Sequence, residues 1–147
     1  MPADAKERLE NVGRIVEMAL SKGMEKADIF VDPLYFPIAV DSSYGKHAFE
    51  AIEGIRAEFG DEIHIAGGMS NVSFGIPKRR LINDVFLNLA IKAGVDSGII
   101  DPMTPSAERS MNVDLDSGPA QLALDLLQGN DDFAMNYITA FRAGELD

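Results

Sequence analysis

The hydrophobic residues of this chain follow two alternating patterns, long helical stripes and short apolar runs. Apolar residues spaced three and four apart predict amphipathic helices, and a glycine just beyond each stripe is a typical helix end. These stripes cover residues 4–22, 44–59 and 79–93, and they are followed by Gly23, Gly60 and Gly94. The short runs predict buried strands. They lie at residues 28–31, 63–66 and 97–100.

The last third of the chain is predicted to be loop and then helix. Segment 103–117 is polar and predicts a loop. Pro119 stands at a first-turn position and opens a helix that runs to Leu127. Asn130 is the expected N-cap of a final helix. The apolar stripe of that helix comprises Phe133, Tyr137, Ile138 and Phe141.

Strands and helices therefore alternate, and this order predicts an α/β fold with a parallel sheet. The predicted strands begin near residues 29, 63 and 97, which are 34 residues apart. A period near 30 fits a (β/α)₈ barrel, and a doubly wound sheet fits the alternation as well. About three strands are too few to close a barrel, and open sheet edges invite pairing with another chain. Residues 1–147 are thus expected to form a single domain, either an open sandwich or part of a barrel completed by another polypeptide or another copy.

The amino-acid composition limits the metal sites, binding partners and cellular locations that are expected for this chain. The chain has 147 residues and no cysteine, which excludes disulfides and thiolate metal sites, and its two histidines leave little scope for a metal site. The net charge of -11 disfavours nucleic acid and anionic membranes. No apolar run approaches the roughly 18 residues needed to span a bilayer. The charged N-terminus does not resemble a secretory signal, so a cytoplasmic location is expected.

Small and hydrogen-bonding residues gather where the predicted strands end. The glycine-rich stretch 67–75 follows the second strand and precedes the third helix. Asp32, Ser70, Asn71 and Asp101 all follow strands, so in a parallel sheet they share one rim, where ligands of α/β folds bind. Two carboxylates and an amide, without a cationic base, favour a polar, nitrogen-rich ring over an anion.

Simpler interpretations of these residues stay open. An Asp before a proline is often a turn residue, which applies to Asp32 and even more to Asp101. The basic run 78–80 opposes the dipole of the third helix, so it is either kept for an anionic ligand or is a solvated surface run. His64 is expected to be a packed or hydrogen-bonded core residue, and His47 an exposed helix residue.

Four motifs resemble one known family, the pterin-binding methyltransferases that act between methyltetrahydrofolate and a corrinoid protein. The most specific is Gly-Met-Ser-Asn-Val-Ser-Phe-Gly, with a Leu-Ile-Asn downstream. The resemblance extends from about residue 10 to residue 140. The motifs occupy residues 68–75, 80–83, 93–102 and 30–34.

The resemblance implies a (β/α)₈ barrel of which this chain matches only the later part, strands six to eight with their helices. It implies that Asp32 binds the pyrimidine edge of the pterin. Asn71 would lie next to N5, the nitrogen that carries the methyl group, as a donor whose hydrogen bond strengthens in the transition state. Gly68 and Ser70 would shape the pocket wall.

The function implied by the resemblance is methyl transfer between 5-methyltetrahydrofolate and the cobalt of a corrinoid (cobalamin) carried by a partner protein. The chain would then supply part of the pterin pocket and need no metal ligands of its own. An alternative is a non-catalytic pterin-binding or assembly subunit, or a truncated remnant of such an enzyme. Phe74, where relatives often carry a polar residue, and the missing first half of the barrel favour this alternative.

Overall fold

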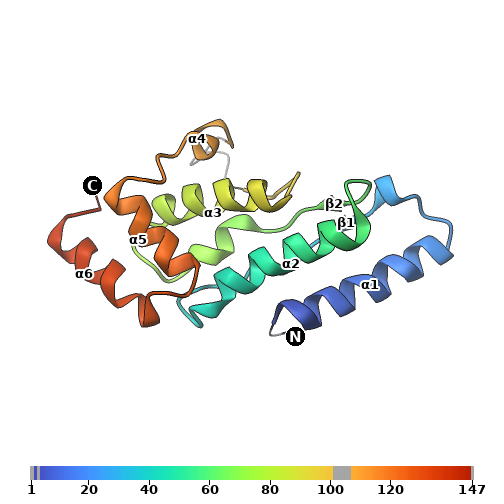
Figure 1. Cartoon of the computed structure of the whole chain (residues 1–147), viewed down its shortest axis with the longest axis horizontal. Coiled ribbons are helices and arrows are strands. Elements are labelled where there is room, and N and C mark those ends of the chain that lie inside the picture. Colours follow the sequence, from blue (N-terminus) through green and yellow to red (C-terminus); the bar gives the residue numbers. More distant parts are fainter. Residues whose placement is uncertain (1, 3, 101–106, 147) are drawn as a thin grey trace.

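A computed structural model describes residues 2, 4–100 and 107–146 of the chain. The fold is mixed α/β, mostly helical with a small parallel sheet (Figure 1). The elements, in order, are α1 (Ala5–Ser21), η1 (Lys26–Asp28), β1 (Phe30–Val31), α2 (Ser43–Phe59), β2 (His64–Ile65), η2 (Met69–Ser73), α3 (Arg79–Ala93), α4 (Ala107–Met111), α5 (Gly118–Leu127), η3 (Asp132–Ala134) and α6 (Met135–Ala143).

The three long helices form where the apolar stripes predict them, with ends that differ by at most one residue. Asp4 begins α1, because its carboxylate accepts a hydrogen bond of 2.8 Å from the Glu7 N–H. Gly94 ends α3 with a φ of 123°, a conformation that side chains disfavour, and its N–H bonds the Ala90 and Ile91 carbonyls.

The sheet is parallel, as expected, but smaller than the sequence predicts. Phe30 pairs with His64 and Val31 with Ile65. The expected third strand at 97–100 is wrong as a strand, because it makes only one isolated parallel bridge, between Gly68 and Ile99. Directly after the bridge the chain enters η2 at Met69, so the pairing does not continue as a ladder.

Helices cover one face of the small sheet, and among the described residues no helix covers the other face. Val31 and Ile65 are buried in the hydrophobic core, which lies between the sheet and the helices α2, α3 and α5. Side chains alternate along a strand, so Phe30 and His64 share the opposite face, where their rings stack 4.5 Å apart. Phe30 remains 61% exposed there. Figure 1 shows α1 lying along α2, so that α2 separates it from α3.

A short helix, α4, stands where the sequence predicts a loop. It is fixed to α3 by buried polar groups: Asp84 accepts hydrogen bonds from the Ser110 hydroxyl (3.0 Å) and from Arg109 (2.6 Å), and the Asn88 amide donates to the Ser110 carbonyl (2.9 Å). The apolar pattern cannot reveal α4, because these contacts and not an apolar stripe hold it. Residues 101–106 lie outside the described part of the chain.

The final helix begins later than predicted, at Met135, and Asn130 is not its cap. The Asp131 carboxylate takes that role, accepting from the backbone N–H groups of Asn136 and Tyr137, both at 2.9 Å. Phe133 has a φ of 56° and is 89% exposed, so it does not belong to the predicted apolar stripe, whereas Tyr137 is fully buried and Ile138 packs against the core.

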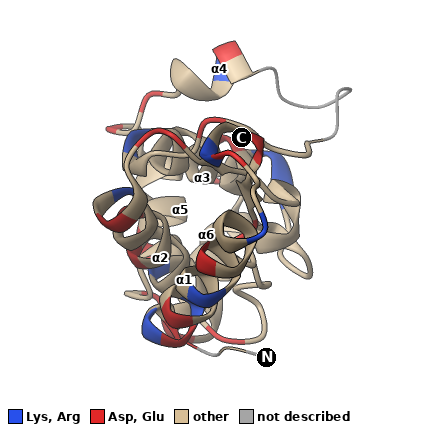
Figure 2. Ribbon diagram, turned by 90° about the vertical axis from the view of Figure 1, so that its right-hand side faces the viewer, with Lys and Arg blue, Asp and Glu red and all other residues tan. Residues whose placement is uncertain are grey.

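The outer surface carries charges of both signs. In Figure 2, acidic and basic residues are interleaved along the outward faces of the helices. Within the described ranges, the helices do not combine the length and apolar character that crossing a bilayer requires.

Candidate functional site

Asp32 follows β1 directly and takes part in a tight turn. Its Oδ1 accepts a 2.8 Å hydrogen bond from the Leu34 N–H, and Leu34 has a φ of 64°. A leucine in this left-handed conformation is strained, and the carboxylate holds it in place. The Oδ2 atom has no hydrogen-bond partner among the described residues, and Asp32 is exposed. The turn and the ligand contact are therefore compatible, since one oxygen serves the turn and the other faces outward.

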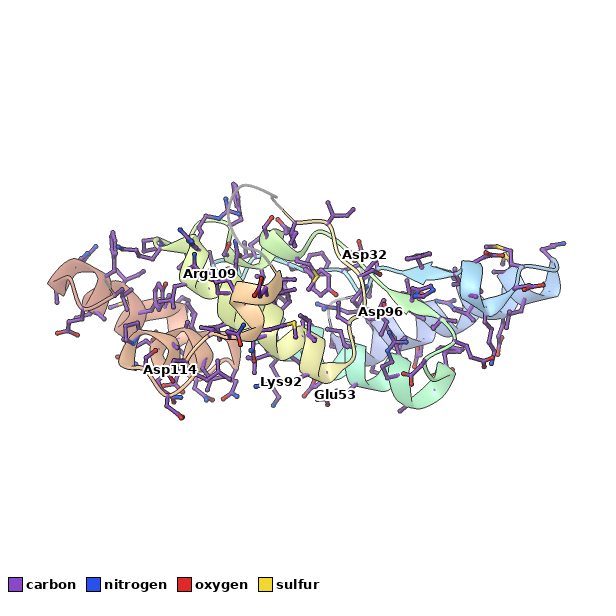
Figure 3. The ribbon with its side chains drawn as sticks, turned by 90° about the horizontal axis from the view of Figure 1, so that it is seen from above. Asp32, Glu53, Lys92, Asp96, Arg109 and Asp114 are labelled. Atoms are coloured by element: carbon purple, nitrogen blue, oxygen red, sulfur yellow. The ribbon has the colours of Figure 1, made fainter. Side chains whose placement is uncertain are left out.

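Gly67 brings the end of β2 against the same loop. A Cβ at this position would stand 2.6 Å from Cε2 of Tyr35 and 2.7 Å from Oδ1 of Asp32. Any side chain here would displace both residues. In Figure 3, Asp32 lies on the opposite side of the molecule from Glu53 of α2 and Lys92 of α3, so this rim lies away from the outward faces of those two helices.

Asn71 lies on η2, which is anchored by the buried side chains of Met69 and Val72. Its Nδ2 donates a 2.6 Å hydrogen bond to the Tyr35 carbonyl. One of the two N–H groups of Nδ2 is therefore engaged, and the other N–H and Oδ1 remain for a ligand. The Ile38 N–H also bonds the Val72 carbonyl at 3.0 Å, so the loops that carry Asp32 and Asn71 are joined to each other.

The other predicted site residues lie on the same loop as Asn71 or outside the described chain. Gly68 is exposed, with no atom within 4 Å of the position that a Cβ would take. Ser70 is half-buried and contributes its carbonyl to a local network. The structure thus brings Asp32, Gly68, Ser70 and Asn71 to two joined loops beyond the strand ends. Asp101 lies outside the described residues.

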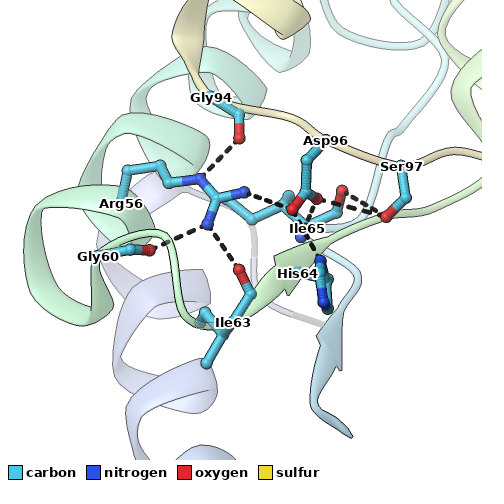
Figure 4. A network of polar contacts seen from close by, with 8 residues as sticks. All are labelled: Arg56, Gly60, Ile63, His64, Ile65, Gly94, Asp96 and Ser97. Atoms are coloured by element: carbon cyan, nitrogen blue, oxygen red, sulfur yellow. Dashed lines mark hydrogen bonds and ion pairs between the residues drawn. The ribbon is translucent and has the colours of Figure 1, made fainter. Parts of the chain in front are cut away.

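A second polar cluster, not predicted from the sequence, lies at the opposite end of β2 (Figure 4). Arg56 of α2 donates to the backbone carbonyls of Gly94 (2.6 Å), Gly60 (2.9 Å) and Ile63 (2.6 Å), and forms an ion pair of 3.2 Å with Asp96. The partners are up to 40 residues away in sequence, and nothing in the local pattern around Arg56 distinguishes it from a surface arginine. In β/α folds this end of the sheet serves stability more than chemistry.

Asp96 connects this cluster to β2. Its Oδ1 accepts from the Ile65 N–H (2.9 Å), and its Oδ2 lies 2.8 Å from Nδ1 of His64. The hydrogen-bonded role expected for His64 is confirmed, although the residue is half-exposed. His47 is also half-buried and not exposed as predicted. Burial alone would raise the pKa of Asp96, but the bonds from His64 and Ile65 and the charge of Arg56 outweigh it, so the pKa lies below its usual value.

Asp96 is expected to make the fold sensitive to acid. A carboxyl group whose pKa is lower in the folded state stabilises the fold above its unfolded pKa of about 3.9 and loses this effect as the pH falls. Asp96→Asn should lower the free energy of unfolding by about 1 kcal/mol at pH 7, since the group is partly exposed. Urea unfolding should show this difference shrinking at pH 3. Asp61→Asn, at an exposed position, is the matched control. An equal loss at both pH values would contradict the linkage.

A comparison with known protein families identifies the class to which this chain belongs. The model of a family described as pterin binding enzyme matches residues 3–101, which include both strands, the two joined loops and α3. The chain therefore belongs to the pterin binding enzymes, and the resemblance found in the sequence is confirmed.

Two individual proteins are similar to this chain in sequence. The chain is 32% identical over 146 residues to a methylcorrinoid:tetrahydrofolate methyltransferase from Eubacterium limosum, which covers 99% of this chain and 50% of that protein. It is 31% identical over 123 residues to a methionine synthase from Mycobacterium tuberculosis, covering 76% of this chain and 10% of that protein. The chain thus spans about half the length of the first of these relatives and a tenth of the second.

Proposed function

We propose that this chain supplies part of the pterin pocket for methyl transfer between 5-methyltetrahydrofolate and the cobalt of a corrinoid protein. The observation that carries the proposal is the placement of Asp32 and Asn71 on two loops that are hydrogen-bonded to each other. Both loops follow parallel strands, where α/β folds hold ligands. The family match and the names of the relatives support the same substrate and partner.

We infer that the domain, residues 1–147, corresponds to the later part of a (β/α)₈ barrel. The parallel pairing of β1 with β2 and the bridge at Ile99 support this, as does the 34-residue period of the sequence. In the described chain β1 pairs only with β2, so its other edge is free to accept a further strand. The remaining strands would come from another part of the polypeptide, a second chain or a further copy.

Asp32 and Asn71 each keep a side-chain oxygen that could accept a hydrogen bond from the pterin. The Oδ2 atom of Asp32 would accept an N–H from the pyrimidine edge while Oδ1 keeps the turn at Leu34. For Asn71 we infer an acceptor role rather than the donor role, because a protonated N5 has a hydrogen to donate and no lone pair left to accept one. Its Oδ1 would accept a hydrogen bond from N5 when N5 carries a proton.

An acceptor at N5 has a clear chemical use. When the methyl–N5 bond breaks, its electron pair stays on N5, and protonation of N5 makes it a better leaving group. A hydrogen bond that is stronger to protonated N5 than to the neutral amine lowers the barrier selectively. The corrinoid would supply the cobalt nucleophile. The chain's own residues would hold the pterin ring and the proton.

A second candidate is a non-catalytic pterin-binding or assembly subunit. The free edge of β1 and the uncovered face that carries Phe30 favour it, because both are surfaces for another protein. This candidate predicts pterin binding or association without turnover.

Calorimetric titration of the purified chain with 5-methyltetrahydrofolate tests the proposal. Saturable binding is expected, and Asp32→Ala should weaken it by tenfold or more, about 1.4 kcal/mol, because a charged acceptor is lost. Asp28→Ala, an exposed acidic residue before the start of β1, should bind like the wild type. Equal binding by the two variants would refute the role of Asp32.

In an assembly that transfers the methyl group, Asn71→Ala should lower kcat by about 100-fold, the size of a lost acid–base or electrostatic contact. Unchanged turnover would remove Asn71 from the mechanism. Binding without turnover in an assembly with the corrinoid protein would select the non-catalytic candidate.

A further inference from the structure

Arg79, the first residue of α3, reaches back to the loop that carries Asn71. Its Nη2 donates to the Ser70 carbonyl at 2.9 Å, and its Nε donates to the Ser73 hydroxyl at 3.0 Å. The Ser73 hydroxyl in turn donates to the same Ser70 carbonyl at 3.1 Å, and Ser73 is fully buried. The guanidinium, the hydroxyl and the carbonyl thus form a closed set of bonds around η2.

This arrangement is unfavourable for the helix that Arg79 begins. A cation at a helix N-terminus opposes the dipole, and α3 has no acidic residue in its first turn. The preceding residue, Lys78, adopts a left-handed conformation with a φ of 51° and makes no side-chain cap bond to the helix. The residues at the start of α3 therefore do not stabilise the helix at this point. The presence of an arginine at its first position needs a different physical reason. The bonds to η2 provide it.

We propose that Arg79 is a positioning residue for Asn71, an inference that rests on the proposed function. The Ser70 carbonyl belongs to the peptide bond that joins Ser70 to Asn71. Fixing this carbonyl therefore fixes the backbone from which the Asn71 side chain projects. The Tyr35 carbonyl holds the side-chain Nδ2 from the other direction. Backbone and side chain are both restrained, and Oδ1 is directed by the two contacts together.

The geometry calls for an arginine and not merely a positive charge. The planar guanidinium presents Nε and Nη2 to two acceptors at once, whereas a lysine ammonium is a single point charge. The guanidinium carbon also lies 5.8 Å from the centre of the Phe74 ring, within the range of a cation–π contact. Phe74 thus has a role beside the site, as a surface on which Arg79 rests.

Hydrogen exchange tests the restraint without any ligand. The amides of Asn71 and Phe74 bond within the turn, to the Gly68 and Asn71 carbonyls. In Arg79→Gln their exchange should quicken about tenfold, and Arg79→Lys should fall between this variant and the wild type. Arg80→Gln, the neighbouring exposed arginine, is the matched control and should exchange like the wild type. Equal exchange in Arg79→Gln and Arg80→Gln would overturn the proposal. Circular dichroism confirms that each variant is folded.

A double-mutant cycle tests whether Arg79 acts through Asn71. With methyl transfer from 5-methyltetrahydrofolate in the assembled enzyme as the readout, Arg79→Gln should lower kcat about tenfold in the wild-type background and by less than twofold when Asn71 is already alanine. A loss of the same size in both backgrounds would show that Arg79 acts independently of Asn71. If the wild-type chain binds no folate, the proposed function fails, and the exchange rates still decide whether Arg79 orders the turn.

Discussion

Replacing Arg56 with methionine is expected to lower the free energy of unfolding by about 3 kcal/mol, because a largely buried guanidinium with three backbone hydrogen bonds and one partly exposed ion pair is lost. The side chain is only 13% exposed and donates to three backbone carbonyls besides pairing with Asp96. Methionine fills a similar volume and supplies no donor. The three carbonyls would then lose this partner in a partly buried place, and each unsatisfied carbonyl costs free energy, while Asp96 would keep its bonds to Ile65 and His64.

Urea unfolding monitored by circular dichroism measures this loss, provided the m-value is unchanged. Arg56→Lys should lose less, because an ammonium can still serve Asp96 and one of the carbonyls. Arg14→Met, at an exposed position of α1, is the control and should cost less than about 0.5 kcal/mol. A loss below 1 kcal/mol for Arg56→Met would mean that the cluster in Figure 4 contributes little.

Gly45→Ala is the second substitution with a large expected effect, and its sign is the reverse of the usual one. Alanine in place of glycine inside a helix normally stabilises by about 0.5–1 kcal/mol. Gly45 of α2, however, faces α5, and a Cβ would stand 2.2 Å from the Leu127 carbonyl oxygen and 3.0 Å from its carbon. Both are backbone atoms, so the helices must move apart. The fold should lose about 1–3 kcal/mol.

Gly13→Ala in α1 gives the matched comparison. A Cβ there would lie 3.5 Å from its nearest neighbour, an oxygen of the Glu58 side chain, which is an ordinary contact. We expect this variant to be slightly more stable than the wild type. Thermal unfolding should therefore shift in opposite directions for the two substitutions. A rise in Tm for both would show that α5 can move away from α2 at no cost.

The helices could be predicted from the sequence because each has its own apolar stripe. The exact ends of the helices and their capping residues were harder to predict from the sequence. Asn130 and Asp131 are both good caps by type, and only the place where the chain turns at Phe133 decides that Asp131 faces the first turn of α6. The sequence predicts a full third strand because Ile99 lies in an apolar run, but in the structure Ile99 forms only a single bridge.

The candidate site was predictable in outline, because strand ends in a parallel sheet share a rim. Asp32 and Asn71 are 39 residues apart in sequence, and their loops meet through Tyr35 and Val72 as the pattern requires. The hydrogen-bonding state of Asn71 was not predictable, since its partner is a backbone carbonyl with no signature in the sequence. The role of Arg79 could not be predicted for the same reason. Its side chain bonds a backbone carbonyl and a serine hydroxyl, and neither acceptor forms a recognisable sequence pattern.

The short length of β1 has a consequence for how the sheet can grow. β1 is two residues long and is followed at once by Asp32 and Pro33, and proline has no N–H to offer a neighbouring strand. The free edge of β1 therefore offers only a few backbone N–H and C=O groups. That number is too small to bind a strand of any sequence, so this edge does not favour fibril-like stacking. A strand that does join there would have to be selected by its side chains, and Phe30, which is 61% exposed on β1, is the apolar side chain next to it.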